Sequence, residues 1–162
     1  MTGVRSVGYR HLRTGFAVSL PEGWDHVDDP QPGVALVALE PDRGTGFRAN
    51  LVVTVDEVPD GVDLAGWQAG CDELLARTLV DYLLLDLHTV SNERGPAAVH
   101  RLAHHLVNDA EAVTMAQWAV LRGRTGLTLT ASAATLAYDS LADTFAAVAG
   151  GFRPDPCDGA AR

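Results

Sequence analysis

The second half of the chain alternates short apolar segments with turns, and this pattern constrains the fold more than any other feature. Four segments have strand character, at residues 82–90, 97–107, 112–121 and 127–133. The links between them are rich in Asn, Asp and Gly, residues typical of tight turns. Because such short links join antiparallel neighbours, the pattern predicts a four-stranded antiparallel meander.

The first half of the chain predicts further strands. The segment Phe16–Trp24 (FAVSLPEGW) alternates apolar and small residues at period two and then breaks at Pro21. We interpret it as the first strand of the same sheet, followed by a corner that Trp24 caps; every later segment can be arranged on it. Residues 1–14 form an arm or an edge strand in this interpretation. The remaining predictions are a loop at 28–33 and strands at 34–39 and 47–55.

Two segments have helical periodicity. Asp63 is a suitable N-cap for the first, because its carboxylate can accept from a free N–H of the first turn. The second begins near Asp139 and ends at the glycine pair 150–151. Because neither helix can bury its apolar stripe alone, both must lie on the sheet, which predicts an α+β fold. The stripe predicted for the first helix consists of Leu64, Trp67, Cys71, Leu74, Leu75 and Thr78, with Gln68, Asp72, Glu73 and Arg77 opposite.

Length and composition predict one domain over residues 1–153 and a flexible tail at 154–162. The formal net charge of -9 argues against a nucleic-acid partner, because phosphate binding needs a basic surface. No segment has the ~20 apolar residues that cross a bilayer, so membrane insertion is not expected. The two cysteines, Cys71 and Cys157, lie in unrelated settings and do not predict a disulfide. The first 16 residues contain no apolar run resembling a signal peptide, so we expect a cytoplasmic protein.

Several short motifs resemble the PsbP-like superfamily, which includes the Ran-binding Mog proteins, DcrB-like proteins and LpqN-type lipoproteins. The resemblance covers roughly Phe16 to Phe152. It implies an α/β/α sandwich built on a mainly antiparallel sheet of about six to seven strands, with two principal helices. It also implies a binding module without catalysis, such as a chaperone or adaptor. The motifs are F-x-V-x-L-P-x-G-W at Phe16–Trp24, the strand Arg48–Val55 ending near Asp56, the helix Leu64–Leu79, Gln117-Trp118, Tyr138-Asp139 and Gly151-Phe152.

Catalytic signatures are missing from the sequence. It contains no G-x-S-x-G, no phosphate-binding G-x-x-x-x-G-K-[ST], no G-x-G-x-x-G after a strand and no H-E-x-x-H. We therefore expect a protein that is not an enzyme and that uses no cofactor.

Histidines are the one group that suggests metal chemistry. His100 and His104 are predicted on one face of a strand, where His88 of the neighbouring strand and Asp86 approach them. Zinc accepts such nitrogen and oxygen ligands. However, His100 and His104 are roughly 13 Å apart in an extended strand, at ~3.3 Å per residue, so one ion cannot contact both. We expect ordinary sheet histidines at these positions and no metal site.

The remaining candidates concern binding. Arg48, Asn50 and Thr54 share one side of a strand, and Thr128, Thr130 and Ser132 share one side of another. With the histidines, these residues would form a polar sheet face for docking, or simply its solvated side. Trp118 is either a core residue or a binding platform.

Two functions from different classes follow. The first is a module for an unidentified protein partner. The second is a small-ligand or lipid-binding protein with a pocket near Trp24, Arg48 and Trp118. A homodimer through strand edges or sheet faces is a further expectation.

Overall fold

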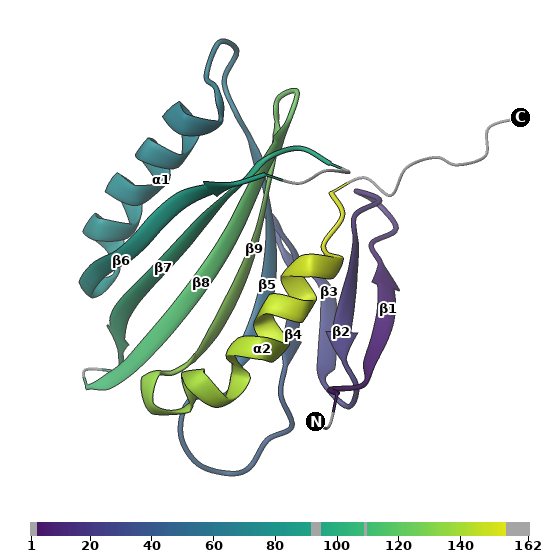
Figure 1. The fold of residues 1–162 in the computed structure, drawn as a ribbon, viewed down its shortest axis with the longest axis vertical. Helices are drawn as coiled ribbons and strands as arrows, with labels where there is room; N and C mark the ends of the chain where they lie inside the picture. The colour runs from purple at the N-terminus through teal and green to yellow at the C-terminus, as the bar shows by residue number, and fades with distance from the viewer. Residues whose placement is uncertain (1–2, 92–94, 109, 155–162) are drawn as a thin grey trace, which may run out of the picture.

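The computed structural model describes residues 3–91, 95–108 and 110–154, with nine strands and two helices in those ranges (Figure 1). The elements are β1 (Ser6–Arg10), β2 (Ala17–Pro21), β3 (Asp25–Gln31), β4 (Val34–Leu39), β5 (Asn50–Glu57), α1 (Leu64–Thr78), β6 (Val80–Val90), β7 (Ala98–Val107), β8 (Glu111–Arg122), β9 (Thr125–Ala134) and α2 (Thr135–Gly151).

Seven strands form one antiparallel sheet in the order β3-β4-β5-β9-β8-β7-β6. The meander β6–β9 is confirmed, and each of its hairpins joins direct neighbours. The chain returns to pair β9 with β5, so the last strand stands at the centre of the sheet. This agrees with the predicted α+β fold and the predicted six to seven strands.

The strand predicted to start this sheet lies elsewhere. Residues 17–21 form β2, which pairs with β1 in a separate two-stranded sheet beside α2 (Figure 1) and is bridged to Arg153 at Ala17. The alternation itself is correct, because Phe16, Val18 and Leu20 are all buried. The assignment to the main sheet was wrong, since periodicity shows which side chains are buried and not which strand is the partner. Residues 1–14 were predicted to form either an arm or an edge strand; residues 6–10 form the strand β1, which pairs with β2.

The loop predicted at 28–33 is instead mostly strand. β3 pairs with β4 along the sheet edge, interrupted by a register shift between Asp28 and Gln31. All seven residues of β3 are exposed, so no apolar period marks the strand in the sequence. Its aspartates and Pro30 are features that protect a sheet edge against further pairing.

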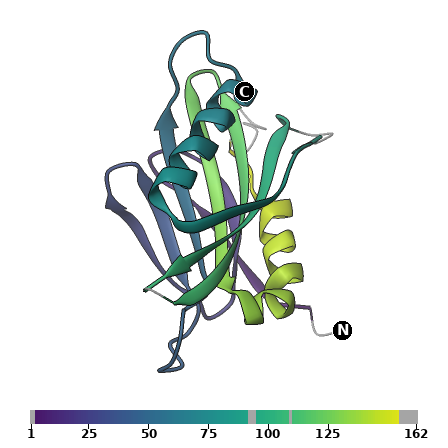
Figure 2. The same cartoon turned by 90° about the vertical axis from the view of Figure 1, so that its left-hand side faces the viewer.

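The two helices cover opposite faces of the sheet (Figure 2). α2 and the β1–β2 sheet pack on the face that carries Leu51 and Leu129, and Phe145 and Val148 of α2 are buried there. α1 lies on the other face, where its Gln68 meets Arg101 of β7. The predicted α/β/α layering is therefore present. Because layers cover both faces of the sheet, the side chains on both faces of β8 are largely buried, and most residues of this strand are apolar.

Four of the six residues of the stripe predicted for α1 are half-buried, namely Leu64, Trp67, Cys71 and Leu75. Asp63 caps the helix as expected, and its Oδ1 accepts from the Gly66 N–H at 2.8 Å. The only buried residue of α1 is Gln68, which was predicted on the polar side, whereas Leu74 of the predicted stripe is exposed. The helix therefore meets the sheet through the Trp67 ring, which lies over Gly126, and through the polar side chain of Gln68. α2 begins four residues earlier than Asp139, at Thr135.

Among the residues that the structure describes, no helix is long and apolar enough to cross a membrane. Cys71 is half-buried, and Cys157 lies outside the described residues together with almost all of the predicted tail.

Candidate functional site

An open cleft lies beside the C-terminal half of α2, over β6, β7 and β8. α2 packs on β2, β9 and β8, and it does not extend across the sheet to β7 and β6. The helix residues that face this space are small: Ala146, Ala149 and Gly150 line it. Because no large side chain fills the gap, a cavity of about 900 Å³ remains, within the range of ligand pockets. We call this cavity the α2 cleft.

The α2 cleft has apolar and aromatic walls with charged groups at its rim. Trp118 projects from β8, and Phe152 follows α2; both pack partly against the core. Arg153 donates to the carbonyls of Gly150 and Phe152 and is therefore tied to the end of the helix. The described lining residues are His88, Val90, Ser91, Gly95, Pro96, Ala98, His100, Trp118, Val120, Leu121, Arg122, Ala146, Ala149, Gly150, Phe152, Arg153 and Pro154.

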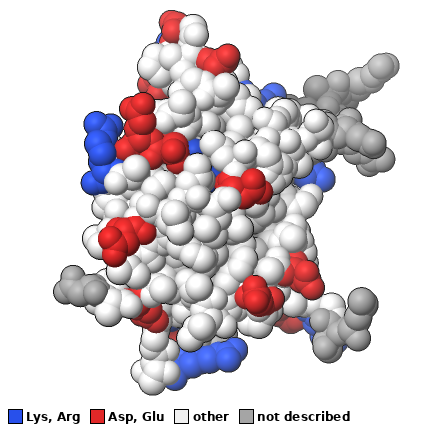
Figure 3. Space-filling model, turned by 60° about the vertical axis from the view of Figure 1, so that its left-hand side comes forward, with Lys and Arg blue, Asp and Glu red and all other residues white. Residues whose placement is uncertain are grey.

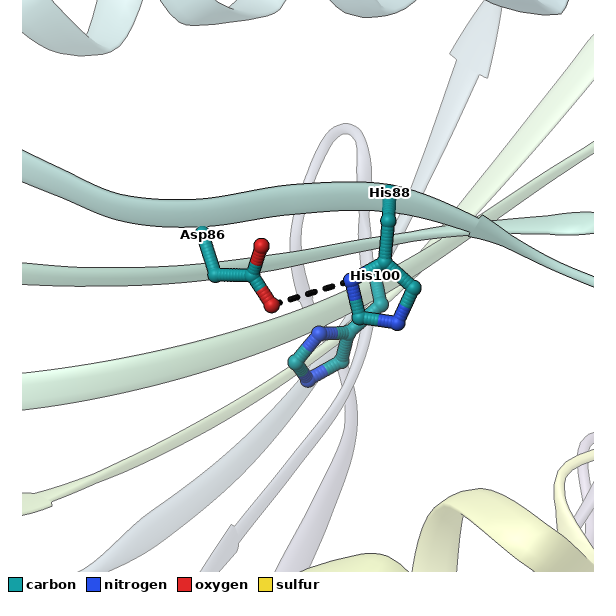
Figure 4. A group of neighbouring side chains, drawn as sticks. All are labelled: Asp86, His88 and His100. Carbon is teal, nitrogen blue, oxygen red and sulfur yellow. Dashed lines mark hydrogen bonds and ion pairs between the residues drawn. The ribbon is translucent and has the colours of Figure 1, made fainter.

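Asp86, His88 and His100 form a cluster at the β6 side of the cleft (Figure 4). His88 and His100 are directly opposite each other in the antiparallel pair β6–β7, with ring centroids 5.1 Å apart. The His88 Nδ1 lies 3.0 Å from the Asp86 Oδ2. His100 in turn lies against Trp118, with ring centroids also 5.1 Å apart. The sequence therefore predicted this approach correctly, but His104 lies further along β7 and is not part of the cluster.

Burial, together with the neighbouring His88, lowers the pKa of His100 below its ordinary value, while Asp86 acts in the opposite direction. The Nδ1 atom of His100 is buried and has no hydrogen-bond partner among the described residues. The ring is therefore held mainly in its neutral form, which can accept a proton or a metal ion.

Arg48 and Trp24 do not reach the α2 cleft, so the pocket predicted near them is wrong in its position. The Arg48 guanidinium donates twice to the Glu40 carbonyl, at 2.7 and 3.0 Å, and closes the loop between β4 and β5. Trp24 packs against the core beyond the β2 corner, as its capping role requires. Trp118 alone of the three lines the cleft, and it also packs against the core.

The polar docking face is also corrected. Asn50, Thr54, Thr128 and Ser132 do share one face, because Asn50 pairs with Ser132 and Thr54 with Thr128. Thr128 and Ser132 are buried there, on the α1 side of the sheet. The histidines stand on the opposite face, since His100 pairs with Trp118 and Trp118 with Leu129. The polar character of these residues could not show that they lie on opposite faces, because the face on which a side chain lies depends on the register of its strand.

The sequence also missed the buried arginine under α1. Arg101 is 1% exposed and donates to the Gln68 Oε1, the Gln117 Oε1 and the Gln68 carbonyl at 2.9–3.1 Å. Its Nε is 3.5 Å from Asp72, which accepts from the Tyr82 hydroxyl. These contacts anchor α1 on the sheet. An arginine in the middle of an apolar strand, facing the same way as Gln117, was the signal that could have revealed them.

The strand β6 forms an exposed apolar edge next to the cleft. Figure 3 shows this side of the molecule, where uncharged surface extends between scattered acidic side chains. Val90 belongs both to this edge and to the cleft lining. The edge contains two register shifts, which interrupt regular strand pairing. Its exposed apolar residues are Val80, Leu83, Leu85, Leu87 and Val90, and Leu74 of α1 is exposed beside them.

Solved structures show which fold this is. Cyanobacterial PsbP (CyanoP) from Synechocystis sp. PCC 6803 superposes with a TM-score of 0.68 at 21% identity, over 94% of both chains. LpqN of Mycobacterium tuberculosis, involved in cell envelope biogenesis, has a TM-score of 0.67 at 16% identity, over 93% of this chain and 91% of its own. The Saccharomyces cerevisiae Ran-binding protein Mog1p has a TM-score of 0.64 at 14% identity, over 94% and 97%. The sequence matches no protein-family model and no curated protein. The PsbP-like fold predicted from the motifs is confirmed.

Proposed function

We propose that this protein is a non-catalytic binding protein that holds an apolar segment of a partner protein in the α2 cleft. The observation that carries the proposal is the cleft itself, a cavity of about 900 Å³ with Trp118 and Phe152 in its walls. Aromatic side chains beside an open apolar cavity are a common feature of binding sites. The similarity to Mog1p, which is described as Ran-binding, supports a protein partner by fold analogy.

A protein segment suits the site better than a small molecule because the cleft borders β6, the last strand of the sheet, which carries further exposed apolar side chains. Val90 lines the cleft, and Leu87 is exposed on the opposite face of the same strand. A small ligand would leave this edge in water, whereas a partner chain can cover both areas. An apolar surface of this kind marks an interaction site.

A small amphipathic ligand is the second candidate. The cavity volume lies within the usual range for ligand sites, and the lining includes the positively charged side chains of Arg122 and Arg153 in an otherwise acidic protein. An apolar molecule with an anionic group, such as a fatty acid, fits this distribution of charge.

Site-specific photo-crosslinking in the native host tests the main proposal. A photoreactive phenylalanine replaces Ala146, an exposed α2 residue that lines the cleft. The matched control places it at Ala137, an exposed alanine of the same helix outside the cleft lining. We expect a discrete cross-linked protein from position 146 and not from position 137. Equal products from both positions, or none, would count against a partner in the cleft.

Native mass spectrometry tests the second candidate on the same preparation. A retained small molecule that is lost from an Ala146→Trp variant, and kept in an Ala137→Trp variant, would favour the ligand. The physical reason is that an indole at position 146 occupies the cavity, whereas one at position 137 points away from it.

A further inference from the structure

His88 and His100 are held by two adjacent strands as a directly opposed pair. Opposed residues of an antiparallel ladder have Cβ atoms about 4.5–5.5 Å apart and project from the same face. Asp86 stands two residues before His88 and reaches its imidazole at 3.0 Å. The three side chains thus converge through the register of the sheet, without depending on a loop.

The spacing of the donor atoms is suitable for one metal ion. The ligand atoms of Asp86, His88 and His100 all lie within 4.8 Å of one another. Around a tetrahedral zinc ion, with bonds of about 2.0–2.2 Å, the donors are about 3.4 Å apart. The donor atoms need to move only slightly closer together to bind one ion. The side chains of Asp86 and His88 are half exposed and have room to rotate.

The chemistry of the cluster points to a transition metal. Imidazole nitrogens favour zinc, copper and nickel, whereas magnesium and calcium prefer oxygen ligands. The buried His100 Nδ1, which has no partner among the described residues, is the kind of orphaned polar atom that an ion or water usually satisfies. We propose that Asp86, His88 and His100 together bind one divalent transition-metal ion such as zinc at the wall of the α2 cleft.

Three protein ligands leave a fourth coordination position open, as in zinc sites that bind an exchangeable group. Because His88 and His100 also line the cleft, a carboxylate or imidazole of the occupant can take that position. Metal binding itself does not depend on the proposed function, because it is measured on the protein alone. This proposal replaces the expectation of ordinary sheet histidines.

Calorimetric titration of the untagged, chelator-treated full chain with zinc chloride tests the proposal. We expect one zinc ion per chain, with no competition from magnesium or calcium. Cobalt(II) in place of zinc should give the intense visible absorption of a four-coordinate ion. Removal of groups that merely orient metal ligands weakens binding about 10–100-fold, so His88→Ala and His100→Ala should each weaken it by at least about tenfold.

His104→Ala is the matched control, because His104 lies on the same strand and face, half-buried, but outside the cluster. Its affinity for zinc should equal that of the unchanged protein. Asp86→Asn alters an exposed side chain without disturbing the core, and it too should weaken zinc binding. Circular dichroism verifies that each variant is folded. The proposal is overturned if zinc does not bind, or if folded His100→Ala or Asp86→Asn binds it unchanged. If the protein cross-links a partner at position 146 but does not bind zinc, the metal site is refuted and the proposed partner binding is not.

Discussion

Replacing Arg101 by alanine should destabilise the protein strongly, because this guanidinium is the polar anchor of α1. Two of its three hydrogen bonds end on the buried Gln68, at the Oε1 and the carbonyl, and the third ends on the half-buried Gln117 Oε1. Hydrogen bonds to charged groups contribute about 1.5–3 kcal/mol each, which sets an upper value of about 5–9 kcal/mol for all three. Water can enter the vacated space, and Asp72 is already one-third exposed. We therefore expect a loss of about 3–5 kcal/mol, the range for a broken buried ion pair.

Urea unfolding followed by tryptophan fluorescence measures this loss as a change in the free energy of unfolding. Arg124→Ala is the matched control, because Arg124 also contacts two carboxylates, Glu57 at 2.9 Å and Asp60 at 3.2 Å. All three of these side chains are more than half exposed, so the control should lose at most about 1 kcal/mol. Equal losses for the two variants would refute the argument that burial determines the contribution of the arginine.

Three further predictions concern local features. A Cβ on Gly126 would lie 2.4 Å from the Trp67 ring, so Gly126→Ala should cost about 1–3 kcal/mol in urea unfolding, whereas Gly70→Ala, with nothing within 4 Å, should gain about 0.5–1 kcal/mol. Asp63→Ala removes the α1 N-cap and should cost about 0.5–2 kcal/mol, with thermal melting as the measurement and Asp63→Asn as the variant that retains most of the cap. Burial and the bond to an aspartate raise the pKa of Tyr9 well above its ordinary value. A raised folded pKa contributes stability that is complete below the unfolded pKa of about 10 and is lost as the pH rises toward the folded value. The free energy of unfolding, measured in urea at a series of pH values, should therefore begin to fall above about pH 10, and Tyr9→Phe should flatten this fall; the same slope in both proteins would contradict the prediction.

The strands were predictable wherever one or both faces are buried by apolar side chains. The meander, the strand at 34–39 and the N-cap at Asp63 follow from local periodicity and hydrogen-bonding chemistry, which act over a few residues. β3 escaped prediction because its residues are mostly polar and all exposed, so no apolar period marks the strand. Gln68 of α1 was placed on the polar side because its contact is with Arg101, a buried polar pair that a search for apolar stripes overlooks.

The candidate site was predictable only in part. That Asp86, His88 and His100 approach one another follows from hairpin register, which the sequence indicated through its turns. The size of the α2 cleft depends on how far α2 extends over the sheet and on the small side chains it presents, and neither is encoded in a local pattern.

The sequence by itself determined the antiparallel meander and the two helices, because side-chain periodicity and turn chemistry are local properties; the PsbP-like fold came from the resemblance of its short motifs. Only the tertiary structure decided that β2 leaves the main sheet, that the histidines and the threonines occupy opposite faces, and that Trp118 borders an open cleft. Each of these depends on which distant segments pair. That choice is made by the packing of the whole chain, where one residue of register moves a side chain from one face of the sheet to the other.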